Sequence, residues 1–274
     1  MTRFFKVHGN GNDFIVLDNR DGSLSKEALS SAAPLWCRRK HSIGADGLLV
    51  VEKASDADFT MRIFNADGSE SDMCGNGARA LARYAHHTGL AGASMTFKTG
   101  AGLMKATVTP PWVELDMGRI DLSKGTFDKK LRASDREFCY SSLVVGVSHC
   151  VLLLDEDLST EEKRLMGREI RNNEALFPGG TNVSFVLPFG ENEVRAVTYE
   201  RGVEDLTESC GTGSAAVALV LSTVKGYGSP IRVHNPGGVN EVRFEYEEPS
   251  GVRVWLKGKT ALVVSGDILE EAMA

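Results

Sequence analysis

The stretch "CGNGARA" at residues 74–80 sets one cysteine beside two glycines and an asparagine. Residues 210–216, "CGTGSAA", repeat the pattern. The two cysteines are 210 − 74 = 136 positions apart, close to half of the 274-residue chain. An offset of this size indicates duplication of a whole domain and not a short solenoid repeat. We therefore expect two related domains along the chain.

Each half shows the same order of local patterns, with strand-like alternation before the cysteine and an apolar helical run after it. Helices are expected over 77–89 and 213–226, and also over 25–40 and 159–172, where serines stand in position to cap them. The fold class predicted is α/β (α+β), with two pseudo-symmetric domains, each a mostly antiparallel or mixed sheet around a central helix. Strands are expected over 14–18, 47–52, 59–65, 94–99, 103–109 and 112–118, then over 137–155, 182–188, 193–200, 230–236, 241–247 and 252–258.

The domain boundary is expected near residues 118–121, directly after "WVELDMG". The last apolar run, 261–268, can return to the first domain and close its sheet. We therefore assign 1–118 and 262–274 to an N-terminal domain and 119–261 to a C-terminal domain.

Composition and charge argue against nucleic-acid and membrane partners. The chain is 42% hydrophobic and 25% charged, as in ordinary globular proteins, and its net charge is −6. Without a block of Lys and Arg, no nucleic-acid partner is expected. Apolar runs such as residues 143–147 are too short to span a bilayer, and the N-terminus has no apolar signal core. We expect no membrane partner and a cytoplasmic location.

The five cysteines predict free thiols. Their number is odd and no C-x-x-C pair occurs, which argues against a disulfide framework and a structural zinc site, so no metal is expected. Cys37, Cys139 and Cys150 are expected to be small buried residues. Cys74 and Cys210 remain as candidates for chemistry.

The cysteine motif has a chemical rationale. The first N–H groups of a helix have no partner within it, the helix dipole adds positive charge there, and glycines allow close approach, so such a helix start binds anions. The same field favours a thiolate. Two such motifs facing one interdomain cleft can hold a carboxylate while one thiolate removes an α-proton and the opposite thiol delivers one. This predicts racemisation or epimerisation of a small-molecule substrate at a carbon beside a carboxylate. No pyridoxal phosphate lysine pattern or Rossmann fingerprint is present, so no cofactor is expected.

Five stretches together resemble the diaminopimelate epimerase family, which comprises cofactor-independent epimerases and racemases of the paired-thiol type. These are "KVHGNGNDFIVLD" (6–18), "SIGADGLLVVE" (42–52), "MRIFNADGSESDMCGNGARALARY" (61–84), "FPGGTNVSFV" (177–186) and "YERGVEDLTESCGTGSAA" (199–216). The resemblance covers nearly the whole chain. It implies interconversion of LL- and meso-diaminopimelate in lysine and peptidoglycan precursor biosynthesis. Dimers are common in the family, so the resemblance allows a homodimer.

The resemblance also implies roles for individual residues. Cys74 and Cys210 are the acid–base pair, and His149 and Glu200 assist the thiols. Arginine suits a planar carboxylate, and asparagine can accept from an ammonium group or donate to a carboxylate. The implied substrate-binding residues are Asn12, Asn65, Asn182, Glu200 and Arg201 at the far end of the substrate, and the backbone of Gly75, Asn76, Gly211 and Thr212 at its reacting carboxylate.

One departure leaves the substrate open. Where the family often reads Gly-Asn-Pro-His, this chain reads "GVSH" at 146–149. Val147 therefore replaces an asparagine that contacts the distal group, and such a polar contact to a charged group is worth ~1.5–3 kcal/mol. A racemase of the same fold acting on another amino acid is the alternative. A non-catalytic binding protein is a third hypothesis, disfavoured by the two retained cysteines, and a thiol oxidoreductase is disfavoured by the missing C-x-x-C pair.

Overall fold

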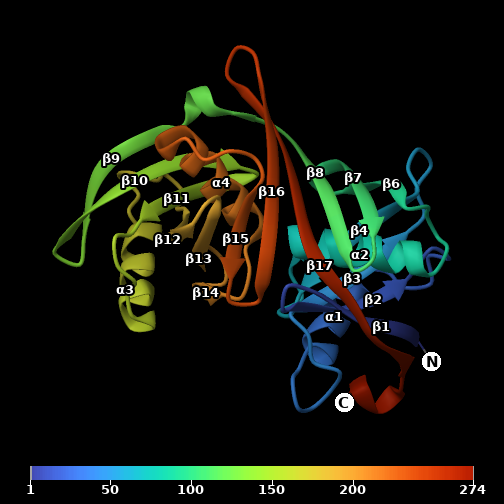
Figure 1. Cartoon of the computed structure of the whole chain (residues 1–274). Helices are drawn as coiled ribbons and strands as arrows, with labels where there is room; N and C mark the ends of the chain where they lie inside the picture. The colour runs from blue at the N-terminus through green and yellow to red at the C-terminus, as the bar shows by residue number, and fades with distance from the viewer. Residues whose placement is uncertain (1, 274) are drawn as a thin grey trace. The chain divides into compact units, whose positions relative to one another are not determined.

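The computed structural model describes residues 2–273 and divides into two compact units. Unit 1 comprises Met1–Asp116 and Gly258–Ala274, and unit 2 comprises Met117–Lys257. Figure 1 shows that strands dominate both units and that helices are few. The predicted sheet-rich α+β class is therefore confirmed.

Two of the four α-helices begin at the predicted serine caps. Ser25 accepts a hydrogen bond from the backbone N–H of Ala28, and Ser159 forms a reciprocal capping box with Glu162. The helices are α1 (Lys26–Trp36), α2 (Gly75–His87), α3 (Thr160–Arg171) and α4 (Gly211–Lys225), with short 3-10 turns at Leu122–Lys124 and Glu270–Met273. Among residues 2–273, no helix combines the length and apolarity needed to cross a membrane.

The helix ends correct three predicted boundaries. Helices α2 and α4 each begin two residues earlier than predicted because Cys74 and Cys210 themselves serve as N-caps. Helix α1 ends at Trp36 and not at residue 40. The chain turns back there, and the N–H groups of Gly44 and Ala45 bond to the carbonyls of Trp36 and Cys37.

Unit 1 contains a mixed sheet whose strands surround α2. β1 runs antiparallel to β2, β2 runs parallel to β3, and β3 runs antiparallel to β4. The long strand β17 pairs with β1 from Thr2 opposite Ile268 to Gly9 opposite Thr260. The strands are β1 (Thr2–Gly9), β2 (Asn12–Asp18), β3 (Gly47–Glu52), β4 (Phe59–Asn65), β5 (Glu70–Ser71), β6 (Ser94–Thr99) and β7 (Gly102–Thr109), together with residues 112–116 of β8 (Trp112–Asp121) and residues 258–268 of β17 (Gly251–Ile268).

Unit 2 repeats this plan. β10 and β11 form an antiparallel hairpin, β11 runs parallel to β12, and β12 runs antiparallel to β13. The single run predicted over 137–155 is wrong: Gly146, with φ of 69°, forms a tight turn between Val145 and Val147. The strands are β9 (Thr126–Ala133), β10 (Arg136–Val145), β11 (Val147–Leu153), β12 (Asn182–Gly190), β13 (Glu193–Glu200), β14 (Asp205–Thr207), β15 (Ile231–Asn235) and β16 (Gly238–Glu247).

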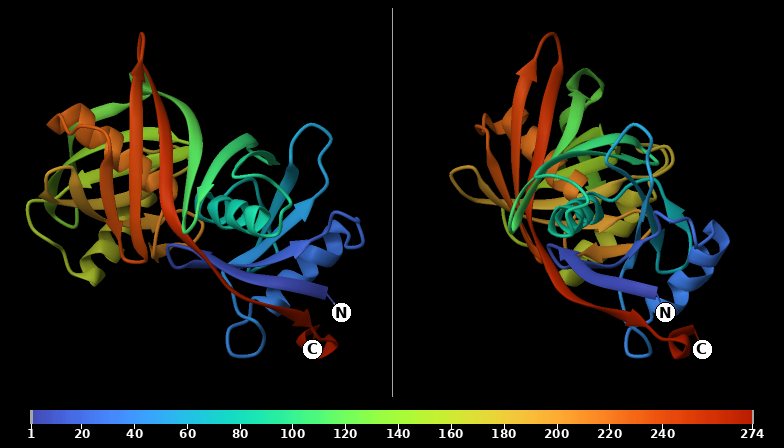
Figure 2. Two further views of the ribbon diagram at one scale, coloured as in Figure 1. Left: turned by 45° about the vertical axis from the view of Figure 1, so that its right-hand side comes forward. Right: turned by 90° about the vertical axis from the view of Figure 1, so that its right-hand side faces the viewer.

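The sheet of unit 2 separates two helices. Strand alternation turns Val151 toward α4, and it turns Cys150 and Leu152 toward Met166 and Ile170 of α3. Figure 2 shows the curved strands around α4, whose residues 215–221 are all fully buried. The predicted burial of this apolar helix on most sides is confirmed.

The sheet of unit 1 has the same two-sided packing. Ile15 and Leu17 pack with Leu29 of α1 in one core cluster. Phe14 and Leu49 lie on the other face, against the first turn of α2. In both units a central helix that follows a cysteine covers one face, and an amphipathic helix covers the other.

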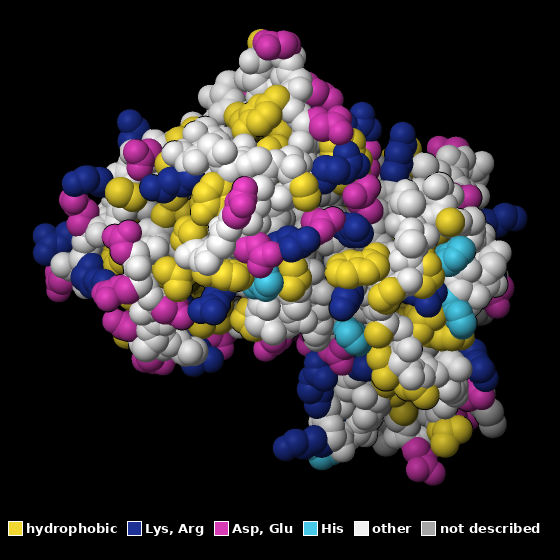
Figure 3. Space-filling model, in the orientation of Figure 1, with side chains coloured by type: hydrophobic (Ala, Val, Ile, Leu, Met, Phe, Trp, Pro, Cys, Tyr) yellow, Lys and Arg dark blue, Asp and Glu magenta, His cyan; other side chains and the backbone are white. Residues whose placement is uncertain are grey.

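The three remaining cysteines differ in their exposure to solvent. Cys37 and Cys150 are buried as predicted, but Cys139 is exposed. The prediction for Cys139 is wrong because it stands between Phe138 and Tyr140, whose side chains take the inward face of β10. On the face drawn in Figure 3, acidic and basic side chains are interspersed.

Candidate active site

Cys74 caps the helix that follows it. Its backbone is extended, with φ of −138° and ψ of 122°, and its Sγ accepts a hydrogen bond from the N–H of Gly77 at 3.5 Å. The first turn of α2 contains no acidic side chain. The positive end of this helix is thus directed at the sulfur and not neutralised by a neighbouring carboxylate of that turn.

The end of β1 approaches this helix closely. A side-chain carbon at Gly9 would lie 2.9 Å from the carbonyl oxygen of Asn76. The following turn contains Asn10 and Gly11, both with positive φ, and delivers Asn12 beside the sulfur. This close approach explains the glycine at position 9.

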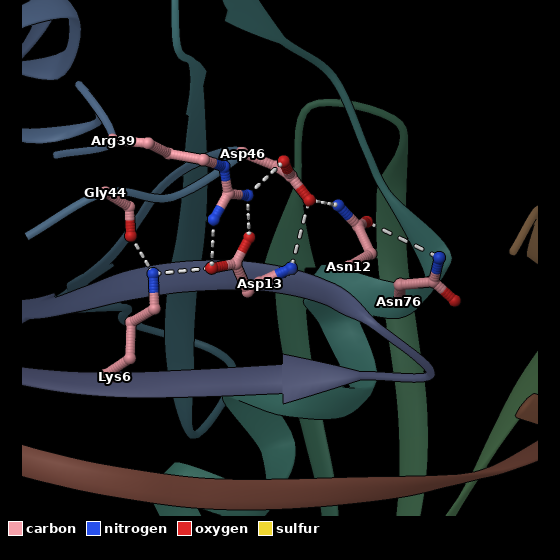
Figure 4. A network of polar contacts seen from close by, with 7 residues as sticks. All are labelled: Lys6, Asn12, Asp13, Arg39, Gly44, Asp46 and Asn76. Carbon is pink, nitrogen blue, oxygen red and sulfur yellow. Dashed lines mark hydrogen bonds and ion pairs between the residues drawn. The ribbon is translucent and has the colours of Figure 1, made fainter. Parts of the chain in front are cut away.

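Asn12 connects Cys74 to a charged cluster, and Figure 4 shows Asn12 between Asn76 and that cluster. Its Oδ1 accepts from the Sγ of Cys74 at 3.6 Å and from Nδ2 of Asn76 at 3.4 Å. Its Nδ2 donates to Oδ2 of Asp46 at 2.7 Å. Because a carboxylate oxygen only accepts, Asp46 fixes the amide so that its oxygen faces the thiol.

The charged cluster holds Asp46 in turn. Arg39 bridges Oδ1 of Asp46 at 2.8 Å and Oδ1 of Asp13 at 2.6 Å, and Lys6 pairs with Asp13 at 2.6 Å. Burial opposes ionisation of Asp13, yet Arg39 and Lys6 hold its pKa below the ordinary value. Asp13 therefore stays charged and keeps the cluster together.

Asn65 lies at the same edge of the sheet but makes separate contacts. Gly47 of β3 pairs with Phe14 of β2 on one side and with Asn65 of β4 on the other. The Nδ2 of Asn65 donates to Oγ of Ser69 at 2.9 Å and to Oγ of Ser71 at 2.8 Å. These bonds hold its amide within its own turn.

Cys210 repeats the capping geometry in unit 2. Its Sγ accepts from the N–H of Gly213 at 3.3 Å and lies 3.5 Å from Oγ1 of Thr212. A side-chain carbon at Gly213 would lie 3.1 Å from that sulfur and 3.0 Å from Oγ1 of Thr198. The glycine is thus required by the sulfur's own position. The first turn of α4 also lacks an acidic residue.

Glu200 places a carboxyl group against Cys210. Burial raises the pKa of Glu200, while hydrogen bonds with Thr207 and Cys210 act in the opposite direction. Thr207 Oγ1 donates to Oε1 of Glu200. A carboxylate in this position can take the proton of the thiol.

His149, Asn182 and Arg201 lie together at the edge of the same sheet. His149 on β11 pairs with Asn182 on β12, and Oδ1 of Asn182 accepts from the backbone N–H of Arg201 at 2.8 Å. Burial, and then the charge of Arg201, lower the pKa of His149 to about 3, so its imidazole is neutral at ordinary pH. Nη1 of Arg201 donates to the carbonyl of Gly179 at 3.0 Å, and the side chain is exposed.

The predicted residues thus form two groups, one in each unit. Asn12, Gly75 and Asn76 gather at Cys74, while Asn65 bonds elsewhere. Glu200, Gly211 and Thr212 gather at Cys210. His149, Asn182 and Arg201 lie together at the edge of the sheet of unit 2. Among residues 2–273, no three His, Cys, Asp or Glu side chains are grouped as metal ligands. Sequence analysis missed Arg79 and Asp46, although both fall inside the quoted motifs.

Solved structures define the class of fold. The phenazine biosynthesis protein of the PhzF family from Bacillus anthracis superposes with a TM-score of 0.75 at 15% identity, covering 98% of this chain and 99% of its own. A hydroxyproline epimerase from Agrobacterium vitis, with bound trans-4-hydroxy-L-proline, gives a TM-score of 0.69 at 17% identity, covering 97% and 91%. The chain therefore has the two-domain fold of these proteins.

Sequence comparison then gives the family. The sequence model of diaminopimelate epimerase matches residues 4–122 and 141–262. The diaminopimelate epimerase of Methanothrix thermoacetophila is 35% identical, covering 98% of this chain and 97% of its own, and that of Aquifex aeolicus is 35% identical, covering 98% and 99%. The chain belongs to the diaminopimelate epimerase family, and the family resemblance is confirmed.

Proposed function

We propose that this protein is an epimerase that interconverts LL- and meso-diaminopimelate by two-base proton transfer at the α-carbon, without pyridoxal phosphate. The observation that carries the proposal is the pair of cysteines, each capping a helix whose first turn lacks acidic residues. Family membership and the names of the curated relatives support the substrate. The reaction supplies precursors of lysine and peptidoglycan.

The reacting carboxylate is held by the helix starts. In the proposed complex, the backbone of Gly75 and Asn76 and that of Gly211 and Thr212 donate to its oxygens. These donors stabilise the charge that develops when the α-proton leaves. The proposal requires both thiols to reach the same α-carbon.

Proton transfer follows from the groups beside the thiols. One cysteine, as thiolate, removes the α-proton, and the thiol of the other delivers a proton to the opposite face of the carbon. Glu200 accepts the proton of Cys210 when that residue must act as the base. His149 is the proposed assistant of the other thiol, and its imidazole is neutral at ordinary pH.

The distal amino-acid group is bound by charges and amides. Arg201 offers a planar guanidinium to the distal carboxylate, and Glu200 offers an acceptor to the distal ammonium. Asn12, Asn65 and Asn182 are the amides proposed to bind this group.

A racemase acting on another amino acid is the second candidate. The feature that favours it is Val147, which ends the tight turn after Gly146, and a side-chain carbon at Gly146 would lie 3.8 Å from Cγ2 of Thr212. Val147 therefore puts an apolar side chain at the position where the family resemblance implies an asparagine that contacts the distal group. A substrate without a distal charge fits this position better.

The test is α-proton exchange in deuterated water, followed by NMR. Reduced protein is incubated with LL-diaminopimelate and, separately, with single amino acids, and the Cys74→Ala and Cys210→Ala variants serve as controls. We expect exchange and inversion of diaminopimelate, abolished in both variants. Turnover of another amino acid alone supports the racemase. Absence of exchange with every substrate from folded, reduced protein contradicts both.

The predicted domain boundaries, 1–118 with 262–274 and 119–261, belong to the same proposal, as do the cytoplasmic location and the homodimer. The domains are proposed to be the two copies of one ancestral unit. Light scattering across a range of protein concentrations tests the dimer.

A further inference from the structure

Arg79 is a buried cation beside the reactive helix start. It lies on α2, five residues after Cys74, and its side chain is 0% exposed. A fully buried arginine is costly unless its charge is compensated. The contacts of this side chain are therefore informative.

The guanidinium makes one strong bond to the Cys74 loop. Its Nη2 donates to Oδ1 of Asn76 at 2.7 Å, while Nε and Nη1 have no hydrogen-bond partner within residues 2–273. Since Oδ1 of Asn76 faces Arg79, its Nδ2 is directed to Oδ1 of Asn12. The two amides are thus oriented from both ends, by Arg79 at one and by Asp46 at the other.

Strand β17 is shaped for this guanidinium. A side-chain carbon at Gly258 would lie 2.9 Å from Nε of Arg79 and 3.0 Å from its Cζ. Only a glycine lets the flat group lie against the strand at this point. The arginine is therefore accommodated by the surrounding fold.

Helix stability does not explain this residue. A cation near the positive end of a helix is unfavourable. The corresponding position in unit 2, five residues after Cys210, is the fully buried Ala215. The packing that the two units share therefore does not require an arginine at this position.

The charge of Arg79 acts on Cys74. Burial lowers the pKa of Arg79 to about 10, so it remains protonated at neutral pH, and the negative charge of a Cys74 thiolate acts in the opposite direction. The interaction is reciprocal, since a charge that stabilises the cation is stabilised by it.

Other titratable groups surround α2 without forming bonds to Arg79. Lys6 and Asp13 pair with each other, and Arg62 pairs with Glu52 and Glu70. Besides Arg79, the titratable groups on α2 and on the elements packed against it are Arg3, Lys6 and His8 on β1, Asp13 and Asp18 on β2, Arg62 on β4, Lys105 on β7, Arg83, Tyr84, His86 and His87 on α2, Asp72 and Cys74 before α2, and Arg253, Lys257, Lys259 and Asp267 on β17.

We propose that Arg79 is a positioning residue for Cys74, whose buried cation stabilises the Cys74 thiolate and whose bond to Asn76 fixes the amide that faces Asn12. The inference rests on the proposed function, which requires Cys74 to hold and release a proton. Asn12 accepts from the thiol and thereby favours the protonated form, while Arg79 favours the thiolate. Cys74 thus lies between two opposing influences.

The test measures thiolate formation without substrate. Reduced protein is alkylated with iodoacetamide between about pH 5 and pH 9, and the Cys74 and Cys210 peptides are quantified by mass spectrometry. In Arg79→Met we expect the Cys74 rate at neutral pH to fall about tenfold and its pH midpoint to rise, with Cys210 unchanged. Arg79→Lys restores part of the rate. Arg83→Met, which removes a partly exposed cation from the same helix, is the matched control and leaves both rates unchanged.

Gly258→Ala provides a second variant that keeps the charge and displaces the guanidinium, and it should also slow Cys74. An unchanged Cys74 profile in folded Arg79→Met overturns the inference, and so does an equal change at Cys210. If Arg79→Met does not fold, an unchanged profile in folded Gly258→Ala overturns it. Exchange of diaminopimelate is measured in parallel on the same samples. If the unmodified chain does not exchange diaminopimelate but the Cys74 profile is altered in the Arg79 variant, only the proposed function is refuted.

Discussion

Cys74 and Cys210 receive the same hydrogen bond from the backbone, yet they lie in opposite electrostatic surroundings. Each caps a helix and accepts from a glycine N–H three residues later. The buried cation of Arg79 bonds to Asn76 in the first turn after Cys74, whereas the partly buried carboxyl group of Glu200 bonds to Cys210 itself. The duplicated backbone thus holds two thiols in one geometry, while the neighbouring side chains give each a different protonation chemistry.

The glycines of the two motifs differ in the same way. At Gly213 an added side-chain carbon would meet the cysteine sulfur itself, at 3.1 Å. At Gly77 it would meet Cδ2 of Leu49 at 3.1 Å, while the Cβ of Cys74 is 3.6 Å away. Gly213 thus leaves room for the sulfur of Cys210, and Gly77 leaves room for the core side chain of Leu49.

The largest expected effect concerns Glu200. Glu200→Gln keeps the shape and removes the base beside Cys210, so α-proton exchange should fall about 100-fold. The raised pKa means that the folded state holds a proton which the unfolded state releases, so stability falls as pH rises through that window. The free energy of unfolding at neutral pH should therefore not fall in Glu200→Gln. Exposed Glu208→Gln is the control, and equal loss of exchange in both variants would contradict a special role for Glu200.

The next effect concerns acid stability and His149. The pKa of His149 is about 3 in the folded chain and 6.5 ordinarily. Between these two values His149 therefore binds a proton in the unfolded chain but not in the folded chain. Stability should fall with decreasing pH between these values, by about 1.4 kcal/mol per pH unit from this group. Chemical unfolding of His149→Gln should show a shallower fall than the unmodified chain. Exposed His87→Gln is the control and should keep the original slope. Identical slopes for all three proteins would refute the prediction.

The smallest effect separates the two glycines. Gly213→Ala should displace the sulfur of Cys210 and lower exchange about tenfold with modest loss of stability. Gly77→Ala should instead lower the free energy of unfolding by about 1–3 kcal/mol through overpacking, with a smaller effect on exchange. Exchange rates and denaturant unfolding are measured on both. The prediction is contradicted if Gly77→Ala loses more exchange activity than Gly213→Ala and Gly213→Ala loses more stability than Gly77→Ala.

Much of the fold could be predicted because local patterns agree with it. The apolar run of β3 and the alternation in β4 and β6 predicted strands with the bounds that the structure has, and the capping serines predicted the starts of α1 and α3. The tight turn at Gly146 was missed because apolar residues continue on both sides of it. The exposure of Cys139 was missed because a cysteine is a poor indicator of strand face.

The sequence by itself determined the duplication, the class of fold, the family and the candidate cysteines, because these depend on residue types at fixed spacing along the chain. The tertiary structure alone decided what surrounds each thiol. Arg79, Gly258 and Asp46 are distant from one another in sequence, and only packing brings β17 and the loop before β3 against the start of α2. Burial then sets the pKa of Arg79 and of Glu200, because desolvation depends on the whole fold and not on neighbouring residues in the chain.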